Sequence, residues 1–130
     1  MPDKKNILLA TSEDHIFNEV KASLGGTHRI ARVKEGAQVL KFIFEINPVL
    51  VILDLQIGNM GGMATSLDLR LEQRAGRIPP QKILMLLDRD ADIFLGKRSE
   101  ADNWLVKPID SLKLSQDVTK MLKIETSITN

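Results

Sequence analysis

Short runs of apolar residues recur along the chain, and each is followed by a segment with helical spacing. Continuous runs of this length predict strands, and the branched ones predict strands that are buried on both faces. The run at 28–33 carries Arg29 and Arg32 between apolar neighbours, which predicts an edge strand whose arginines lie on a solvated face. The five predicted strands are 6–10, 28–33, 49–53, 83–87 and 104–106.

Between these runs, apolar residues three or four positions apart predict amphipathic helices. Ser12 is the predicted N-cap of the first helix and Asp110 that of the last, whereas Gly25-Gly26 and Asn47-Pro48 end the first two. A short helix is expected between residues 89 and 100. The predicted buried faces are Ile16, Val20 and Leu24; Val39, Leu40, Ile43 and Ile46; Met63, Leu67 and Leu71; and Leu114, Val118, Met121 and Leu122.

Five strands alternating with five helices predict an α/β fold with a parallel sheet and helices on both faces. The natural arrangement is the flavodoxin-like (βα)5 doubly wound sheet with strand order 2-1-3-4-5. In such sheets ligands bind in the crevice at the carboxyl ends of the strands. The residues predicted to line this crevice are Thr11, Ser12, Asp54, Leu87, Asp88 and Lys107.

Composition limits the chain to an ordinary globular class. Its 130 residues suffice for one domain, predicted at residues 1–124, with a polar tail at 125–130. The net charge of +1 gives no electrostatic reason for this domain alone to bind nucleic acid or a membrane. The absence of cysteine and of a long apolar stretch favours a cytoplasmic location.

Two charged residues follow predicted buried strands, and their setting is informative. Asp54 follows the third strand, and Lys107-Pro108 follows the fifth, 53 residues later. Together with Met60-Gly61-Gly62 and the run 101–104, this ordered set over residues 5–123 resembles the receiver domain of two-component response regulators. The resemblance implies that Asp54 is the phosphoacceptor, that Lys107 contacts the phosphoryl group, and that the partner is a histidine kinase or another signalling protein.

The chain departs from this family at the positions that bind metal. The family carries an acidic pair after its first strand, where this chain has Thr11 and Ser12. The resemblance leaves Asp54 and the Gln56 carbonyl as magnesium ligands, and hydroxyl groups are weak neutral replacements for carboxylates. Magnesium binding is therefore expected to be weak or absent. Glu13 and Asp14 follow directly, and one alternative is that they restore part of the metal site. The expected role is that of ordinary capping acids in the first turn of the helix.

A second departure affects the switch positions. Leu87 stands where the family has a serine or threonine that contacts the phosphoryl group, and leucine has no hydroxyl to donate. Asp88 replaces a small residue and would repel an incoming phosphate unless Lys107 pairs with it. The Lys107 ammonium is expected to reach the crevice and to pair with Asp54 or Asp88. Trp104 holds the place of the switch aromatic and is expected to be locked, on a surface shared with the last helix.

These departures predict an atypical receiver, or pseudo-receiver, that signals through protein contacts. One alternative is a receiver in which Asp54 is still phosphorylated, slowly. Another is a small flavodoxin-like hydrolase with Asp54 as nucleophile. Phosphatases of that type often need a second acid two residues later, where this chain has Gln56, so the chain is not expected to be an enzyme.

Overall fold

A computed structural model describes the backbone of residues 4–58 and 60–129 and the side chains of residues 4–58 and 60–123. It contains five strands: β1 (Lys5–Ala10), β2 (His28–Val33), β3 (Leu50–Asp54), β4 (Ile83–Leu87) and β5 (Asn103–Val106). Its α-helices are α1 (Asp14–Leu24), α2 (Val39–Ile46), α3 (Gly62–Arg74), α4 (Ile93–Arg98) and α5 (Ser111–Thr129). Short 3-10 segments, η1 (Gly36–Gln38) and η2 (Asp90–Asp92), precede α2 and α4.

The strands form one parallel sheet in the order β2-β1-β3-β4-β5, as the sequence predicted. Its register brings the carboxyl ends of neighbouring strands together. Ala10 of β1 pairs with Leu53 of β3, so the residues that follow them, Thr11 and Asp54, are neighbours. Leu87 of β4 pairs with Val106 of β5. Asp88 therefore lies beside Lys107 at the same edge of the sheet.

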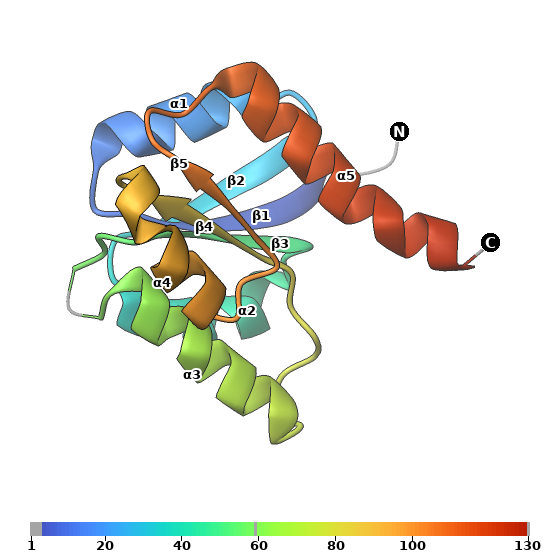
Figure 1. Cartoon of the computed structure of the whole chain (residues 1–130). Coiled ribbons are helices and arrows are strands. Elements are labelled where there is room, and N and C mark those ends of the chain that lie inside the picture. Colours follow the sequence, from blue (N-terminus) through green and yellow to red (C-terminus); the bar gives the residue numbers. More distant parts are fainter. Residues whose placement is uncertain (1–3, 59, 130) are drawn as a thin grey trace.

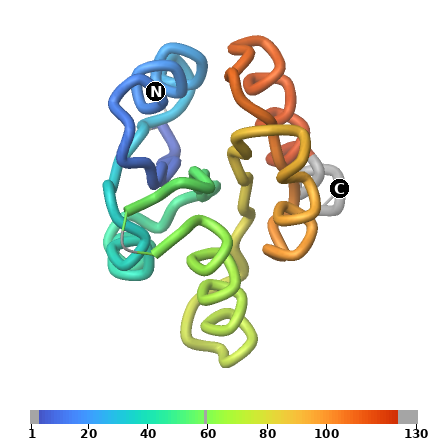
Figure 2. Tube along the Cα trace, turned by 60° about the vertical axis from the view of Figure 1, so that its left-hand side comes forward, coloured from blue at the N-terminus to red at the C-terminus, as the bar shows by residue number. Residues whose placement is uncertain are grey.

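Helices cover both faces of the sheet, with α1 and α5 on one face and α2, α3 and α4 on the other (Figure 1). The same two layers can be followed in the turned view of Figure 2. Successive side chains of a strand point to opposite faces, so each strand contributes to two apolar cores. All residues of β3 and β4 are buried, as expected for central parallel strands.

The start of α1 differs from the sequence-based prediction. Ser12 does not cap this helix; Glu13 is the N-cap residue and its side chain makes no capping hydrogen bond. The Thr11 hydroxyl instead accepts a hydrogen bond from the Glu13 backbone N–H at 3.1 Å. The prediction for α5 is confirmed, because the Asp110 carboxylate accepts the Lys113 N–H at 3.0 Å.

The buried face predicted for α3 is wrong. Leu71 is 55% exposed, and Met63 and Leu67 are only partly buried. Gly62 accounts for the face of α3 that points toward the sheet, because a Cβ atom there would lie 2.4 Å from the Asp54 carbonyl oxygen. The close approach of Gly62 to β3 turns a largely polar face of α3 inward, consisting of Gly62, Thr65, Ser66, Leu69 and Arg70.

The polar residues on this inner face of α3 find partners. The buried Ser66 hydroxyl donates to the Ser99 carbonyl at 2.7 Å. Arg70 donates to the Glu100 and Gln81 carbonyls and forms an ion pair with Asp102 at 2.9 Å. Hydrogen bonds of this kind offset the cost of burying polar groups, which is why apolar periodicity alone failed to predict the inner face.

The backbone of α5 remains helical through Thr129, beyond the predicted domain end at residue 124. The side chains of residues 124–130 lie outside the described part, and the division into residues 1–124 and a polar tail at 125–130 stays a prediction. Within the described part of the chain, no helix is long and apolar enough to cross a membrane.

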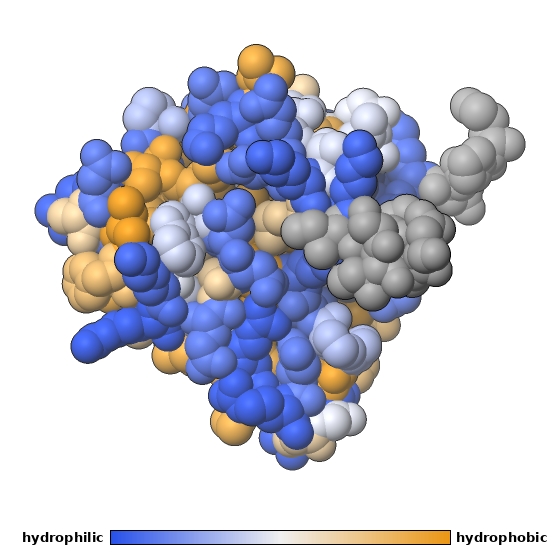
Figure 3. All heavy atoms as spheres, turned by 45° about the vertical axis from the view of Figure 1, so that its right-hand side comes forward, coloured by the Kyte–Doolittle hydropathy of each residue, from blue (hydrophilic) through white to orange (hydrophobic). Residues whose placement is uncertain are grey.

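The view in Figure 3 shows a mostly hydrophilic surface with separate hydrophobic patches. Four large apolar side chains with described placement are exposed: Phe44, Leu71, Phe94 and Leu112. They belong to four different helices, α2, α3, α4 and α5. Because scattered apolar side chains are normal on protein surfaces, these four do not by themselves mark a binding site.

Candidate functional site

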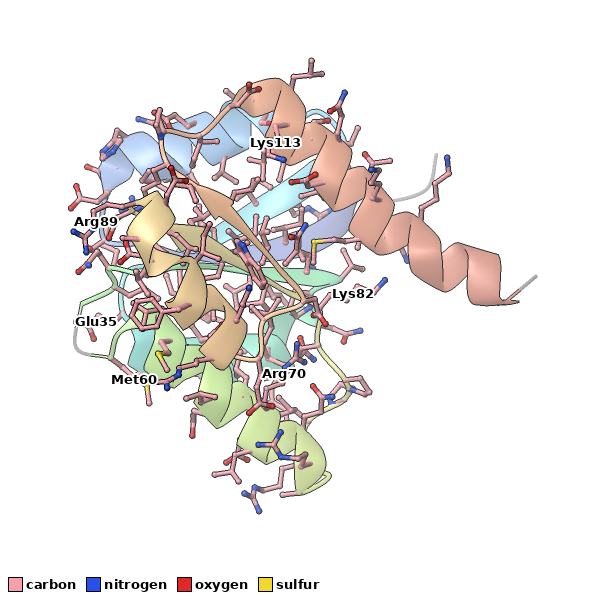
Figure 4. All side chains as sticks on the ribbon, viewed as in Figure 1. Glu35, Met60, Arg70, Lys82, Arg89 and Lys113 are labelled. Carbon is pink, nitrogen blue, oxygen red and sulfur yellow. The ribbon has the colours of Figure 1, made fainter. Side chains whose placement is uncertain are left out.

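The candidate site lies at the carboxyl ends of β1, β3, β4 and β5. In Figure 4 Arg89, just after β4, marks this end of the sheet, and Lys82, just before β4, marks the opposite end. A cavity of about 340 Å³ lies at the opposite end, lined by Lys82, Asn103 and Met121 among others. It is therefore separate from the crevice in which Asp54 and Lys107 meet.

Asp54 is completely buried, and both of its carboxylate oxygens accept hydrogen bonds. The Thr11 hydroxyl donates to Oδ2 at 2.7 Å. The Gln56 backbone N–H donates to Oδ1 at 3.1 Å, and Lys107 Nζ donates to the same oxygen at 2.6 Å. These three donors compensate for the removal of the carboxylate from water.

Thr11 is also fully buried, and each of its polar groups is engaged. Its hydroxyl donates to Asp54 and accepts from the Glu13 N–H. Its backbone N–H donates to the Val33 carbonyl at 3.0 Å, and its own carbonyl accepts from Arg32 Nε at 3.1 Å. The rotamer and the backbone of Thr11 are thus fixed from β2, β3 and α1 together.

Lys107 bridges two acids. Its ammonium lies 2.6 Å from Asp54 Oδ1 and 2.8 Å from Asp88 Oδ1. The Lys107 side chain is 18% exposed, Asp88 is 30% exposed and Asp54 is not exposed at all. The sequence-based expectation that Lys107 reaches the crevice and pairs with Asp54 or Asp88 is confirmed, since its ammonium contacts both acids.

The pKa values of Lys107 and Asp88 are shifted in opposite directions. Burial alone would raise the pKa of Asp88, but hydrogen bonds from Lys107 and Gln56 and the charges of Lys107 and Arg89 lower it below 3.8. Burial alone would lower the pKa of Lys107, but its two hydrogen-bonded carboxylates raise it above 10.5. Both shifts favour the charged forms, so the ion pair between Lys107 and Asp88 persists at neutral pH.

The other hydroxyl after β1 also turns toward the site. The exposed Ser12 side chain donates to the Gln56 carbonyl at 3.5 Å, the limit of a hydrogen bond. The acids that follow Ser12 are directed elsewhere. Asp14 is paired with Arg32 at 2.7 Å, and the exposed Glu13 lies 3.8 Å from His15. Among the described side chains, no three acids or histidines gather closely enough to hold a metal ion.

Leu87 and Trp104 lie together on the α4 side of the sheet. A Cβ atom on Gly96 of α4 would lie 3.1 Å from the Trp104 indole and 3.3 Å from the Leu87 side chain. Trp104 packs against the core beneath α2, α3 and α4, whereas α5 covers the other face. Strand alternation thus points the indole toward α4, and the surface expected to be shared by Trp104 and the last helix stays a prediction.

Two residues that shape the site were not predicted from the sequence. Arg32 was predicted to lie on a solvated strand face, yet its side chain is only 13% exposed and contacts Thr11, Asp14 and the Phe17 ring. Gly62 contributed only to the family resemblance, as part of the run Met60-Gly61-Gly62, yet it packs against the Asp54 carbonyl. Neither role has a local pattern in the sequence, since both depend on contacts across the sheet.

Comparisons with known proteins agree with the geometry, although no family model matches the chain. Over 121 residues the chain is 29% identical to the transcriptional regulatory protein AfsQ1 of Streptomyces coelicolor, covering 91% of the chain and 51% of that protein. Over 93 residues it is 30% identical to the DNA-binding response regulator MtrA of Mycobacterium tuberculosis, covering 72% of the chain and 39% of that protein. The match thus spans about half the length of AfsQ1 and a smaller share of MtrA.

A solved structure shares the fold. The receiver domain of the sensor histidine kinase PA1611 from Pseudomonas aeruginosa, with a magnesium ion coordinated in its active-site cleft, superposes with a TM-score of 0.80. The match covers 93% of this chain and 99% of that domain at 16% identity. The chain is thus similar in sequence to response regulators, and its sheet in the order 2-1-3-4-5 has the fold of a receiver domain.

Proposed function

We propose that this receiver domain works without magnesium-dependent phosphorylation and signals through protein contacts from one constitutive state. Asp54 occupies the phosphoacceptor position, and Lys107 occupies the position that contacts the phosphoryl group. In the proposed state Lys107 pairs with Asp54 and with Asp88, and Asp54 also accepts a hydrogen bond from Thr11. A receiver is a signalling module rather than an enzyme, so Asp54 is not proposed as a hydrolytic nucleophile.

The observation that carries the proposal is the 2.7 Å hydrogen bond from the Thr11 hydroxyl to Asp54 Oδ2. It places a neutral, fully buried donor where the family resemblance implies a metal-binding acid. An active receiver must bring an anionic phosphoryl group to an anionic carboxylate, and that charge has to be neutralised. Here an internal lysine already neutralises Asp54.

The residues present do not suit magnesium. This ion needs near-octahedral oxygen ligands and is usually held by one or two carboxylates together with waters. Both oxygens of Asp54 already accept hydrogen bonds, and the Gln56 carbonyl accepts one from Ser12. A metal ion would have to displace Lys107 or Thr11 from a carboxylate that is closed to solvent.

The switch positions support the same proposal. A Cβ atom on Gly96 of α4 would meet both Leu87 and Trp104, and Leu87 has no hydroxyl that a phosphoryl group could attract. A ligand shifts a conformational equilibrium only when it binds the two states differently. Without a hydroxyl at position 87, phosphate gains no contact that would favour a second state of Trp104. The proposed location of this domain is the cytoplasm, and its proposed partner is a histidine kinase or another signalling protein that recognises the single state.

Isothermal titration calorimetry with Mg²⁺ tests the proposal in a gain-of-function design. The parent should give no binding heat up to millimolar magnesium. The double variant Thr11→Asp, Ser12→Asp restores two acids at the family positions and should acquire a site, because carboxylates are the ligands that Mg²⁺ prefers. Adding Asp54→Asn to the double variant should remove this site.

Two results would contradict the proposal. One is a submillimolar magnesium site in the parent that disappears in Asp54→Asn. The other is a stable phosphoryl label on parent Asp54 after incubation with a small phosphodonor such as acetyl phosphate. The labelling experiment uses Asp54→Asn as its control, since an amide cannot accept the phosphoryl group.

A further inference from the structure

Arg32 is an unusual residue for the carboxyl end of an edge strand. It belongs to β2, the outermost strand on its side of the sheet, where arginines normally extend into solvent. Arg29 on the same strand is exposed, but the Arg32 side chain is only 13% exposed. Arg32 reaches across the β1–α1 corner, the segment 11–14 that carries the two hydroxyl residues.

The Arg32 guanidinium binds this corner at two points. Nε donates to the Thr11 carbonyl at 3.1 Å, and Nη1 donates to Asp14 Oδ1 at 2.7 Å. The Phe17 ring of α1 lies beneath the guanidinium, 5.4 Å from Cζ, in the range of a cation–π contact. A planar guanidinium can hold two acceptors in fixed directions at once, which a lysine ammonium on a flexible stem does less well.

We infer that Arg32 is the positioning residue that keeps the β1–α1 corner closed on Asp54. By fixing the Thr11 carbonyl, Arg32 fixes the direction of the Thr11 hydroxyl, which donates to Asp54 and accepts from the Glu13 N–H. By pairing with Asp14, it also keeps this carboxylate at the β2 side, away from the crevice. The inference rests on the proposed function, because it explains what maintains the metal-free site.

The third guanidinium nitrogen of Arg32 argues against a role in packing alone. Nη2 is buried and has no hydrogen-bond partner among the described atoms. A buried donor without a partner costs free energy, and an apolar side chain of similar length would avoid that cost. A position selected for packing alone would favour such a side chain. The two directed contacts of Nε and Nη1 are what an apolar residue cannot supply.

Amide hydrogen exchange of the metal-free protein, followed by NMR, tests the inference. In Arg32→Met the Glu13 amide, which donates to Thr11 Oγ1, should exchange about tenfold faster because the Thr11 hydroxyl is no longer held. The Gln56 amide resonance should shift, because Gln56 shares the Asp54 carboxylate with Thr11. The Asp102 amide, which donates to the Ile83 carbonyl at the far end of the sheet, should change little.

Three further variants separate positioning from charge and from folding. Arg29→Met removes an exposed arginine from the same strand and should leave the Glu13 and Gln56 signals as in the parent. Asp14→Asn keeps the Nε contact to Thr11 and should change Glu13 exchange by no more than about twofold. Arg32→Lys keeps the charge without the two-point geometry, so Glu13 exchange should still rise, which also covers failure of Arg32→Met to fold.

The inference would be overturned if a folded Arg32→Met or Arg32→Lys variant kept the parent's Glu13 exchange rate and the parent's Gln56 amide chemical shift. An equal rise at Glu13 and Asp102 would also overturn it, because such a rise reports general loosening of the fold. None of these readouts requires magnesium or phosphate. A failure of the proposed function in calorimetry therefore remains distinguishable from a failure of the role of Arg32.

Discussion

Lys107 Nζ lies 2.6 Å from Asp54 Oδ1, so a lysine supplies the positive charge beside a carboxylate that is closed to solvent. The contact joins residues 53 positions apart, at the ends of β3 and β5. Such a pair is costly to break from one side, because removing one partner leaves the other charge buried without compensation. The stability of the fold and the state of the site are therefore coupled through this contact.

The first prediction is that Lys107→Met destabilises the protein at neutral pH by about 3 kcal/mol, because Asp54 and Asp88 lose their shared cation. Urea unfolding monitored by Trp104 fluorescence at pH 7 measures the loss. The matched control is Lys97→Met, since Lys97 is exposed on α4. A Lys107→Met protein as stable as the control would show that the lysine contributes no more than a solvated strand end.

The second prediction concerns acid pH and uses Asp88→Asn. The pKa of Asp88 is lowered, so its contribution to stability is complete above the ordinary value of 3.8 and is lost as the pH falls through the folded-state value. At pH 7 the variant should lose about 1 kcal/mol, because the pair is partly exposed. This deficit should shrink below pH 3.8. Unfolding free energies measured from pH 7 to pH 2 test this, and a deficit that grows in acid would contradict it.

The third prediction is that Thr11→Val lowers the free energy of unfolding by about 1–2 kcal/mol. Valine keeps the shape of threonine but leaves Asp54 Oδ2 and the Glu13 N–H without their partner. Thr119→Val is the control, because the Thr119 hydroxyl donates to a helix carbonyl at an exposed position. Equal losses in the two variants would mean that the Thr11 hydroxyl has no special role at Asp54.

Regular apolar patterns predicted the parallel sheet and its order well, because buried strands such as β3 and β4 carry uninterrupted runs. The same reasoning failed for α3. Its apolar residues Met63, Leu67 and Leu71 repeat every four positions, yet contacts of Gly62, Ser66 and Arg70 set the rotation of the helix. Periodicity detects apolar burial and is blind to polar side chains whose partners lie far away in the sequence.

For the candidate site, too, the sequence predicted one part and not the rest. The meeting of Asp54 and Lys107 followed from strand ends and topology alone. The hydroxyl bond from Thr11 and the reach of Arg32 did not follow, because each depends on side-chain direction across neighbouring strands. The side of the sheet on which Trp104 lies also depended on strand register. Register is set by pairing across the whole sheet rather than by the four residues of β5.

The last prediction concerns Trp104, the single tryptophan of the chain. Its indole is packed beneath α4, where Gly96 leaves just enough room for it and for Leu87. Because position 87 offers no hydroxyl to a phosphoryl group, Mg²⁺ with beryllofluoride should leave the emission of Trp104 unchanged. Gly96→Ala should shift that emission without any ligand, since the new methyl group lies 3.1 Å from the ring and forces it or α4 to move.

Fluorescence of three proteins therefore tests whether the tryptophan is locked. Gly76→Ala is unsuitable as a control, because Gly76 has a positive φ of 75° and alanine would be strained there. Gly26→Ala is suitable, because a Cβ atom at Gly26 meets nothing within 4 Å. The expected order is a shifted spectrum for Gly96→Ala and parent-like spectra for Gly26→Ala and for the parent with Mg²⁺ and beryllofluoride. A saturable response of the parent to beryllofluoride, abolished by Asp54→Asn, would mean that the switch operates despite Leu87.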